Sequence, residues 1–239
     1  MISLIEKTLP SLDENSTLSG RLLSWWEAYG SVALARFYSD EHGSCAALLD
    51  GQAVVICHTD SSREEFGAFI ELQSDIHTIY TDVTTAENLG LPFRLLPVMR
   101  CEQAICALPL PEPSSPREIY DVLTAVFDDF SAFEPWYMDV SYRMRHELCH
   151  QASVYQENTL VSTAMTVAEW ESGTLIGAVA TLPEHRRKGY AAACVGALTA
   201  WCRQVGKTAY ISPKNENARR LYTALGFHDY ETVALIERT

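Results

Sequence analysis

The segment from residue 174 to residue 203 constrains the fold most, because it joins a strand pattern to a helix pattern through a basic turn. Residues 174–182 are apolar and partly β-branched, which is typical of a buried strand. Residues 190–203 are rich in alanine and leucine, which favours a helix. The turn between them holds three consecutive basic residues and then Gly189. Backbone N–H groups at such a helix start are unpaired, so the turn predicts a phosphate site. An ordinary strand–turn–helix connection with solvated basic residues is the alternative.

A second pattern follows one predicted strand later. After residues 208–212 the chain reads Asn215-x-x-Ala218-x-x-Leu221-Tyr222-x-x-Leu225-Gly226-Phe227. Together with Arg186-x-x-Gly189-x-Ala191, this pattern resembles the two acetyl-CoA signatures of the GCN5-related N-acetyltransferase (GNAT) superfamily. Both signatures occur in the order that the superfamily shows, with a strand between them. The resemblance covers about half of the chain, from Pro116 to the C-terminus.

The resemblance implies an α+β fold with a mixed, mostly antiparallel sheet flanked by helices. The first half shows a similar order of patterns, so we predict two such domains in tandem. They are a degenerate GNAT-like domain at residues 1–108, a proline-rich linker at 109–115 and a catalytic domain at 116–239. This plan is similar to that of glycine N-acyltransferase-like proteins. The first domain has an acidic, glycine-free segment at 59–64 where its phosphate turn would lie, so we expect it to bind no cofactor.

Periodicity and turn signals predict the individual elements. In the first half they predict helices at 18–29 and from Ser61 or Ser62 to Gln73, and strands at 32–38, 44–49, 52–58, 77–82 and 95–101. In the second half they predict a helix opened by a capping box at Ser115 and Glu118, helix or extended chain at 138–145, strands at 151–156, 160–170 and 174–182, and a closing strand at 227–236.

The resemblance also assigns roles to residues. The CoA pyrophosphate would be held by Arg186, Arg187, Lys188, Gly189, Tyr190 and Ala191, and the pantetheine arm by backbone groups of Val179, Ala180 and Thr181. Asn215 would contact the cofactor and cap its helix, and Tyr222 would protonate the departing thiolate. Each of these residues also has a plain structural interpretation, as strand packing, helix capping or core packing.

The general base is not evident, because residues 174–182 contain no carboxylate. Glu169, Glu184 and His185 could serve, although each is expected to be a solvated surface residue. Three neighbouring residues, His146, Cys149 and His150, suggest a Cys–His nucleophile. We reject that interpretation, because closeness in sequence does not orient a base on a thiol and direct transfer needs no covalent intermediate.

Composition narrows the class of protein. The net charge of −13 argues against nucleic-acid binding, and no apolar run approaches the roughly 20 residues of a membrane span. Seven cysteines at scattered spacings suggest reduced thiols in the cytoplasm, and no metal-ligand spacing occurs. We therefore expect an N-acetyltransferase that moves an acetyl group from acetyl-CoA directly to a primary amine of a small molecule. A non-catalytic acyl-CoA sensor or interaction module is the alternative. The acceptor and the oligomeric state stay open, a homodimer included.

Overall fold

The chain is divided by its contacts into two compact units. The computed structural model describes residues 1–32, 34–102, 114–128 and 130–238. Unit 1 comprises residues 1–98 and 230–239, and unit 2 comprises residues 99–229. The chain passes from one unit to the other inside two strands, β6 (Phe93–Cys101) and β11 (His228–Glu237). Each unit therefore contains strand residues from both halves of the sequence.

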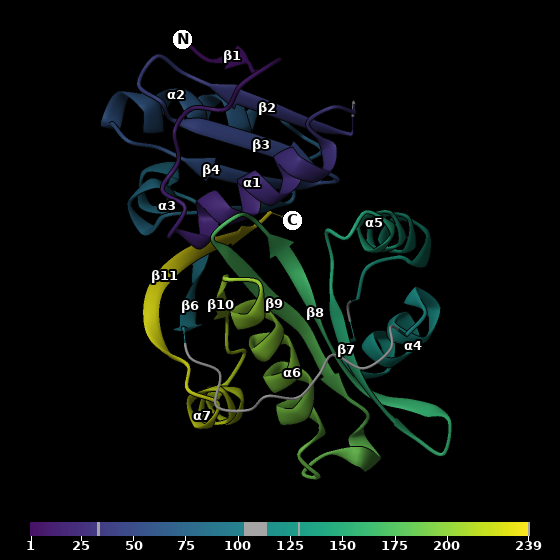
Figure 1. Ribbon diagram of the computed structural model, residues 1–239. Coiled ribbons are helices and arrows are strands. Elements are labelled where there is room, and N and C mark those ends of the chain that lie inside the picture. Colours follow the sequence, from purple (N-terminus) through teal and green to yellow (C-terminus); the bar gives the residue numbers. More distant parts are fainter. Residues whose placement is uncertain (33, 103–113, 129, 239) are drawn as a thin grey trace. The chain divides into compact units, whose positions relative to one another are not determined.

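Unit 1 is built on a sheet with the strand order β1-β2-β3-β4-β5-β11 (Figure 1). Its neighbouring strands are antiparallel apart from β4 and β5, which run parallel and are connected by helix α2. The elements before β6 are β1 (Ser3–Leu4), α1 (Thr17–Tyr29), β2 (Ala35–Ser39), β3 (Cys45–Leu49), β4 (Gln52–Ile56), α2 (Asp60–Glu71), β5 (Thr78–Thr81) and α3 (Val83–Leu89).

Unit 2 is built on a sheet with the strand order β6-β10-β9-β8-β7 (Figure 1). Here β9 and β10 are the parallel pair, connected by helix α6. Its elements are α4 (Pro116–Val126), α5 (Phe133–Arg145), β7 (Gln151–Gln156), β8 (Thr159–Glu169), β9 (Gly173–Thr181), the 3-10 turn η1 (Pro183–His185), α6 (Tyr190–Gln204), β10 (Thr208–Ile211) and α7 (Glu216–Ala224).

The sheet of unit 2 is buried on both faces. On one face, α6 packs with Val195 and Leu198 into a cluster that includes Ala164 of β8. On the other face, α4 packs with Ile119 and Leu123 into a cluster that includes Met165 of the same strand. Successive strand residues point to opposite faces, which explains why neighbours on β8 belong to different clusters.

The two halves of the chain repeat one order of elements: helix, three antiparallel strands, helix, parallel strand, helix, strand. The second half differs in starting with two helices, α4 and α5. This order confirms the predicted α+β class with a mostly antiparallel sheet and agrees with two domains in tandem. The boundaries at 1–108, 109–115 and 116–239 stay predictions, and residues 109–113 of the proposed linker lie outside the described residues. The predicted closing strand at 227–236 differs in its pairing, because residues Ala234 to Glu237 of β11 pair with β5 in unit 1.

Most of the helices and strands predicted from the sequence are found in the structure. Ser115 and Glu118 form the predicted capping box at the start of α4. One prediction is corrected: α2 is capped by Thr59, not by Ser61 or Ser62. Residues 138–145, for which the sequence left helix and extended chain open, are helical within α5. Helix α3 is missing from the sequence prediction, although Asp82 caps its start and Gly90 closes its end.

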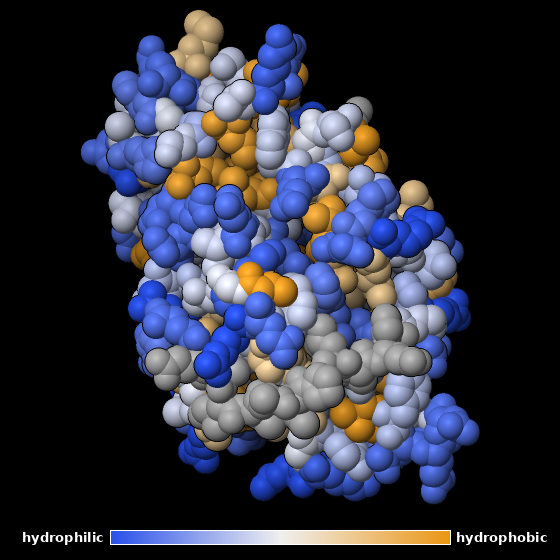
Figure 2. All heavy atoms as spheres, in the orientation of Figure 1, coloured by the Kyte–Doolittle hydropathy of each residue, from blue (hydrophilic) through white to orange (hydrophobic). Residues whose placement is uncertain are grey.

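Hydrophilic residues cover most of the molecular face drawn in Figure 2, with smaller hydrophobic patches among them. This distribution is expected for a chain with a net charge of −13. No helix in the described part of the chain is long and apolar enough to cross a membrane.

Candidate functional site

Strand β9 separates from β10 halfway along its length. The two strands pair from Gly173 opposite Thr208 to Ile176 opposite Ile211, where β10 ends. The remaining residues of β9, 177–181, continue without β10 beside them. This parting leaves backbone groups of Val179, Ala180 and Thr181 on an open strand edge, where an extended ligand could pair with them.

A bulge in β9 lies at the same place. Thr163 of β8 pairs with Ala180 and Met165 pairs with Gly177, so Ala178 and Val179 together oppose a single β8 residue. Ala178 has a positive φ of 48°, which an alanine rarely adopts. The bulge reverses the side-chain alternation, so that Val179 faces α6 and Ala180 faces α4. Bulges of this kind re-aim a strand beside functional sites.

The basic turn follows β9 directly and leads into α6. Arg187 and Gly189 both take left-handed conformations, with φ values of 64° and 83°. Gly189 is the N-cap of α6, and none of the described side chains caps this helix by a hydrogen bond. The first N–H groups of α6 therefore point out of the helix as donors for an anion.

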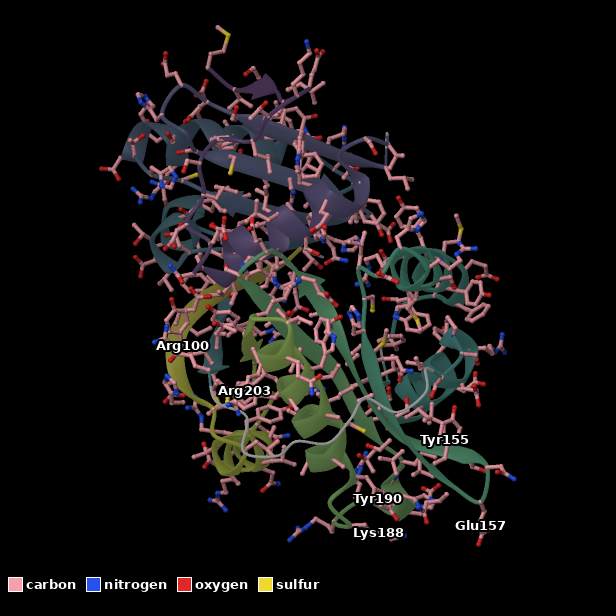
Figure 3. The ribbon with its side chains drawn as sticks, in the orientation of Figure 1. Arg100, Tyr155, Glu157, Lys188, Tyr190 and Arg203 are labelled. Atoms are coloured by element: carbon pink, nitrogen blue, oxygen red, sulfur yellow. The ribbon has the colours of Figure 1, made fainter. Side chains whose placement is uncertain are left out.

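The side chains of this turn supply positive charge around those donors. Arg186, Arg187 and Lys188 are exposed, and Lys188 and Tyr190 lie at the start of α6 (Figure 3). The Arg186 Nε donates a hydrogen bond to the Thr181 carbonyl at 3.1 Å, which ties the turn to the end of β9. Ala191, in the first turn of the helix, is half-buried. The turn has the donors, the charge and the low bulk that a pyrophosphate needs.

The corresponding helix start in unit 1 is already occupied by the protein's own groups. Thr59 caps α2 by accepting a hydrogen bond from the Ser62 N–H at 3.1 Å, and the Ser62 hydroxyl donates to the Asp40 carboxylate at 2.5 Å. Burial alone would raise the pKa of Asp40, but hydrogen bonds from Ser62, His42 and Ser44 keep it below its usual value. A carboxylate therefore sits near the α2 N-terminus, where it would repel a phosphate.

Helix α7 places Tyr222 in the cluster that packs against α6. Asn215 caps α7 by accepting a hydrogen bond from the Ala218 N–H at 3.0 Å, as predicted. The Tyr222 ring is buried near Phe227, in the cluster against which Val179 of the bulge also packs. Burial raises the pKa of Tyr222 to about 12, so its phenol stays protonated at neutral pH. Tyr222, the predicted general acid, therefore lies on the α6 face of the sheet, as Val179 of the bulge does.

One acidic residue lies where the sequence does not predict it. Glu169 is expected at the surface, but only 4% of it is exposed, and its carboxylate accepts hydrogen bonds from the His150 ring at 2.8 Å and the Thr166 hydroxyl at 2.5 Å. Lys207 lies 3.7 Å away. Burial alone would raise the pKa of Glu169, but hydrogen bonds from His150 and Thr166, with the charge of Lys207, hold it below its usual value.

The position of Glu169 makes it unsuitable as a direct base at the bulge. It pairs with Thr174, four strand residues before Ala178, or about 13 Å along the strand. Of the other two possible bases, Glu184 is exposed and His185 is half-buried. The Cys149 thiol donates to the Thr166 carbonyl at 3.3 Å, and burial raises its pKa. This environment agrees with rejecting a Cys–His nucleophile.

Sequence reasoning also missed a group of aromatic side chains at the α4–α5 connection. Their only signal in the sequence is the high density of phenylalanine and tryptophan between residues 127 and 137. Among the described residues, no group of His, Cys, Asp and Glu side chains has the arrangement of a metal site.

Comparison with known proteins finds one family model that matches most of the second unit. The profile of the acetyltransferase (GNAT) family matches residues 116–227, which include β9, the basic turn, α6 and α7. Over residues 116–227 the chain is similar to the GNAT family. Enzymes of the GNAT family use acetyl-CoA as cosubstrate, and the matched residues include the parted end of β9 and the basic turn. No curated protein is detectably similar to the chain in sequence.

Solved structures resemble nearly the whole chain. A GCN5-related N-acetyltransferase from Kribbella flavida superposes with a TM-score of 0.64 at 15% identity, covering 93% of this chain and 94% of the other. A GNAT-family acetyltransferase from Novosphingobium aromaticivorans gives 0.59 at 17% identity, covering 92% and 97%. A tandem GNAT protein from the clavulanic acid biosynthesis pathway gives 0.50 at 13% identity, covering 99% and 98%. At these identities the likeness shows the fold alone. The similarity to glycine N-acyltransferase-like proteins is not among these findings.

Proposed function

We propose that unit 2 transfers an acetyl group from acetyl-CoA to the primary amine of a small molecule. The observation that carries the proposal is the bulged end of β9, which leaves β10 and runs directly into an uncapped, basic helix start. A thioester arm can pair with the open edge while its pyrophosphate meets the α6 N–H groups. Unit 1 has a carboxylate at the equivalent helix start, which supports one cofactor site per chain.

The residues divide the work by position. Arg186, Arg187 and Lys188 neutralise the pyrophosphate, while Gly189, Tyr190 and Ala191 offer it backbone donors and space. Val179, Ala180 and Thr181 orient the pantetheine arm through backbone groups. Asn215 fixes the start of α7 and lies beside the arm. These contacts hold the thioester carbonyl in place for attack.

The chemistry is direct transfer. The neutral amine nitrogen attacks the thioester carbonyl carbon, a C–N bond forms, and the C–S bond breaks. Tyr222 gives its proton to the departing sulfur, and the positively charged nitrogen of the tetrahedral intermediate loses its extra proton to solvent as the amide forms. Tyr222 is then reprotonated from water, so that the products are the amide and free CoA thiol.

A second candidate function is acyl-CoA binding without catalysis. The observation that favours it is the absence of a carboxylate along β9, together with the distance of Glu169 from the bulge. Calorimetry with acetyl-CoA, followed by thiol release with a panel of amines, separates the two. Binding with thiol release supports the enzyme, binding without release supports the sensor, and no binding contradicts both.

We also propose a cellular compartment and a class of partners. The free cysteines of the described residues are buried, which suits a chain made in a reducing compartment such as the cytoplasm. We expect neither nucleic acid nor a membrane as partner, and a homodimer stays open.

A further inference from the structure

A group of aromatic rings joins the end of α4 to the start of α5. The Tyr120 ring lies 4.9–5.8 Å from the rings of Phe130, Phe133 and Trp136, measured between centroids. Phe130 in turn lies 5.9 Å from Trp136 and 6.2 Å from Phe127. These five residues form what we call the aromatic cluster.

The aromatic cluster packs on the same face of the sheet as the bulge of β9. Phe127, Phe130 and Trp136 pack against the buried cluster that contains Ala180, and so does Ala178 at the bulge. The Nζ of Lys214, three residues after β10, lies 5.3 Å from the Phe127 ring centroid. Phe127 therefore lies on the α4 face of the sheet, opposite α6, and beside the segment that follows β10.

The rings of the aromatic cluster do more than cover the sheet. The residues of α4 that cover β8 and β9 are aliphatic and buried, namely Ile119, Val122 and Leu123. The rings of Phe127, Phe130 and Trp136 are only half-buried. Half-buried aromatic rings beside a reactive opening gain free energy when an apolar ligand covers them.

Charges around the rings select among amines. Lys214 lies over the Phe127 ring, and the Arg117 guanidinium lies 4.4 Å from the Phe133 ring centroid. The Arg117 guanidinium is also paired with the Asp121 carboxylate at 3.4 Å. An acceptor with several positive charges would therefore be repelled chiefly by Lys214 at the Phe127 ring. An acceptor with one amine and a neutral apolar group would not, since its amine can be deprotonated at the thioester.

We propose that the aromatic cluster forms the acceptor side of the site, and that the acceptor is a primary amine with an aromatic or branched apolar substituent. This inference rests on the proposed function, because it needs acetyl transfer at the opening between β9 and β10. The competing acceptor class is a polyamine, which would fit a hollow of about 300 Å³ whose lining includes Glu118 and Asp121.

A matched amine series tests the inference. Thiol release from acetyl-CoA is measured with 2-phenylethylamine, isopentylamine, ethanolamine and spermidine. We expect kcat/KM for the first two amines to exceed that for ethanolamine by at least about tenfold, the range that burial of a small apolar group gives in a pocket. A kcat/KM for spermidine or ethanolamine that equals or exceeds theirs overturns the inference.

Single-residue variants test whether the preference for apolar amines depends on the aromatic cluster. Phe127→Ala should raise KM for 2-phenylethylamine about tenfold, leave KM for ethanolamine within about twofold and leave the Kd for acetyl-CoA unchanged. Phe127→Leu, which keeps an apolar side chain, should restore most of the loss. Tyr137→Ala is the matched control, because that ring is 40% exposed and contacts Phe133 without belonging to the aromatic cluster. Equal loss for all amines, or loss in the control alone, contradicts the assignment.

The outcomes separate this inference from the proposed function. If acetyl-CoA binds and no amine releases thiol, the transfer activity fails and the inference fails with it. If amines react without preference for apolar groups, only the inference fails. Thermal unfolding of each variant shows whether a change in KM accompanies a loss of fold.

Discussion

Gly189 carries the sharpest test of the phosphate turn. Its φ of 83° favours glycine, and a Cβ added there would meet no atom within 4 Å. Gly189→Ala should therefore cost about 1 kcal/mol of backbone strain without blocking the site. Gly189→Asp adds the same strain and a negative charge, which repels a phosphate by roughly 4 kcal/mol at about 4 Å and an effective dielectric near 20.

We expect Gly189→Asp to weaken acetyl-CoA binding about a thousandfold, and Gly189→Ala to weaken it far less. Calorimetry gives both dissociation constants, and thermal unfolding shows whether each variant is folded. A folded Gly189→Asp protein with the wild-type dissociation constant would remove the phosphate-turn assignment.

Tyr222 can be tested by removing one oxygen atom. Tyr222→Phe keeps the ring in its buried cluster, so the unfolding free energy should change little. General acid catalysis contributes about 10²–10⁴-fold, and a thiolate leaves tolerably without a proton, so we expect kcat to fall by about a hundredfold. The Kd for acetyl-CoA should stay within about twofold. If kcat is unchanged while chemistry limits the rate, Tyr222 is a packing residue.

At the scale of single residues, the sequence predicts those roles that depend on neighbours a few positions away in the chain. The caps at Ser115 and Asn215 depend on neighbours three positions away, and both are found. Glu169 was misjudged because its partners His150 and Lys207 are 19 and 38 positions away in the chain, and no local pattern reports such contacts.

At the scale of elements, Glu169 links β8 to the start of β7 and to the turn before β10. Its carboxylate has a lowered pKa in the folded state. A carboxylate of this kind stabilises the fold at pH values above its unfolded pKa, near 4.5, and that stability is lost as the pH falls through the folded pKa.

We therefore expect Glu169→Gln to be less stable than the wild type at pH 7, and the difference to shrink below about pH 4.5. Urea unfolding of both proteins between pH 7 and pH 3 measures it. Because the other carboxylates are shared, the difference between the two curves isolates Glu169. A difference that stays constant with pH would mean that the charge of Glu169 is not what stabilises β8.

The start of α2 offers a matched test in unit 1. Asp40→Asn weakens the charged hydrogen bond to Ser62 and should cost about 1 kcal/mol of stability. Because unit 1 is proposed to bind no cofactor, the Kd for acetyl-CoA should not change. Calorimetry checks this directly, and a Kd altered more than about threefold would place cofactor binding in unit 1.

The sequence predicts most elements of both units, since hydrophobic period and turn residues act over a few positions. Helix α3 was missed because its seven residues give too short a pattern. The bulge at Ala178 could not be predicted, because it is a property of how β9 pairs with β8 and not of the alternation within β9.

At the scale of the whole molecule, the last strand belongs to unit 1. Ala234 and Ile236 of β11 are buried in the unit 1 core with Val55, Phe66 and Ile79. Deleting residues 230–239 should therefore abolish hydrogen-exchange protection in β3, β4 and β5. Unit 2, whose residues end at 229, should still bind one acetyl-CoA per chain. Native mass spectrometry and hydrogen exchange measure both outcomes. Loss of protection in unit 2 with unit 1 intact would contradict the division.

Two domains in tandem were predictable from the sequence, but the pairing of the last strand, β11, with β5 of unit 1 was not. Residues 227–236 carry the alternating pattern of a strand, and that pattern is the same whichever sheet the strand joins. Only the pairing of Ala234 with Thr81, 153 positions earlier, shows which sheet β11 joins.

The place of β11 also sets an order of events during synthesis. A ribosome releases the N-terminal residues first, yet the core of unit 1 lacks Ala234 and Ile236 until residues 230–239 have been synthesised. Contacts between such distant positions form slowly. Until then the edge of β5 that pairs with β11 is exposed to other chains, so the nascent protein is most prone to aggregation before residues 230–239 emerge.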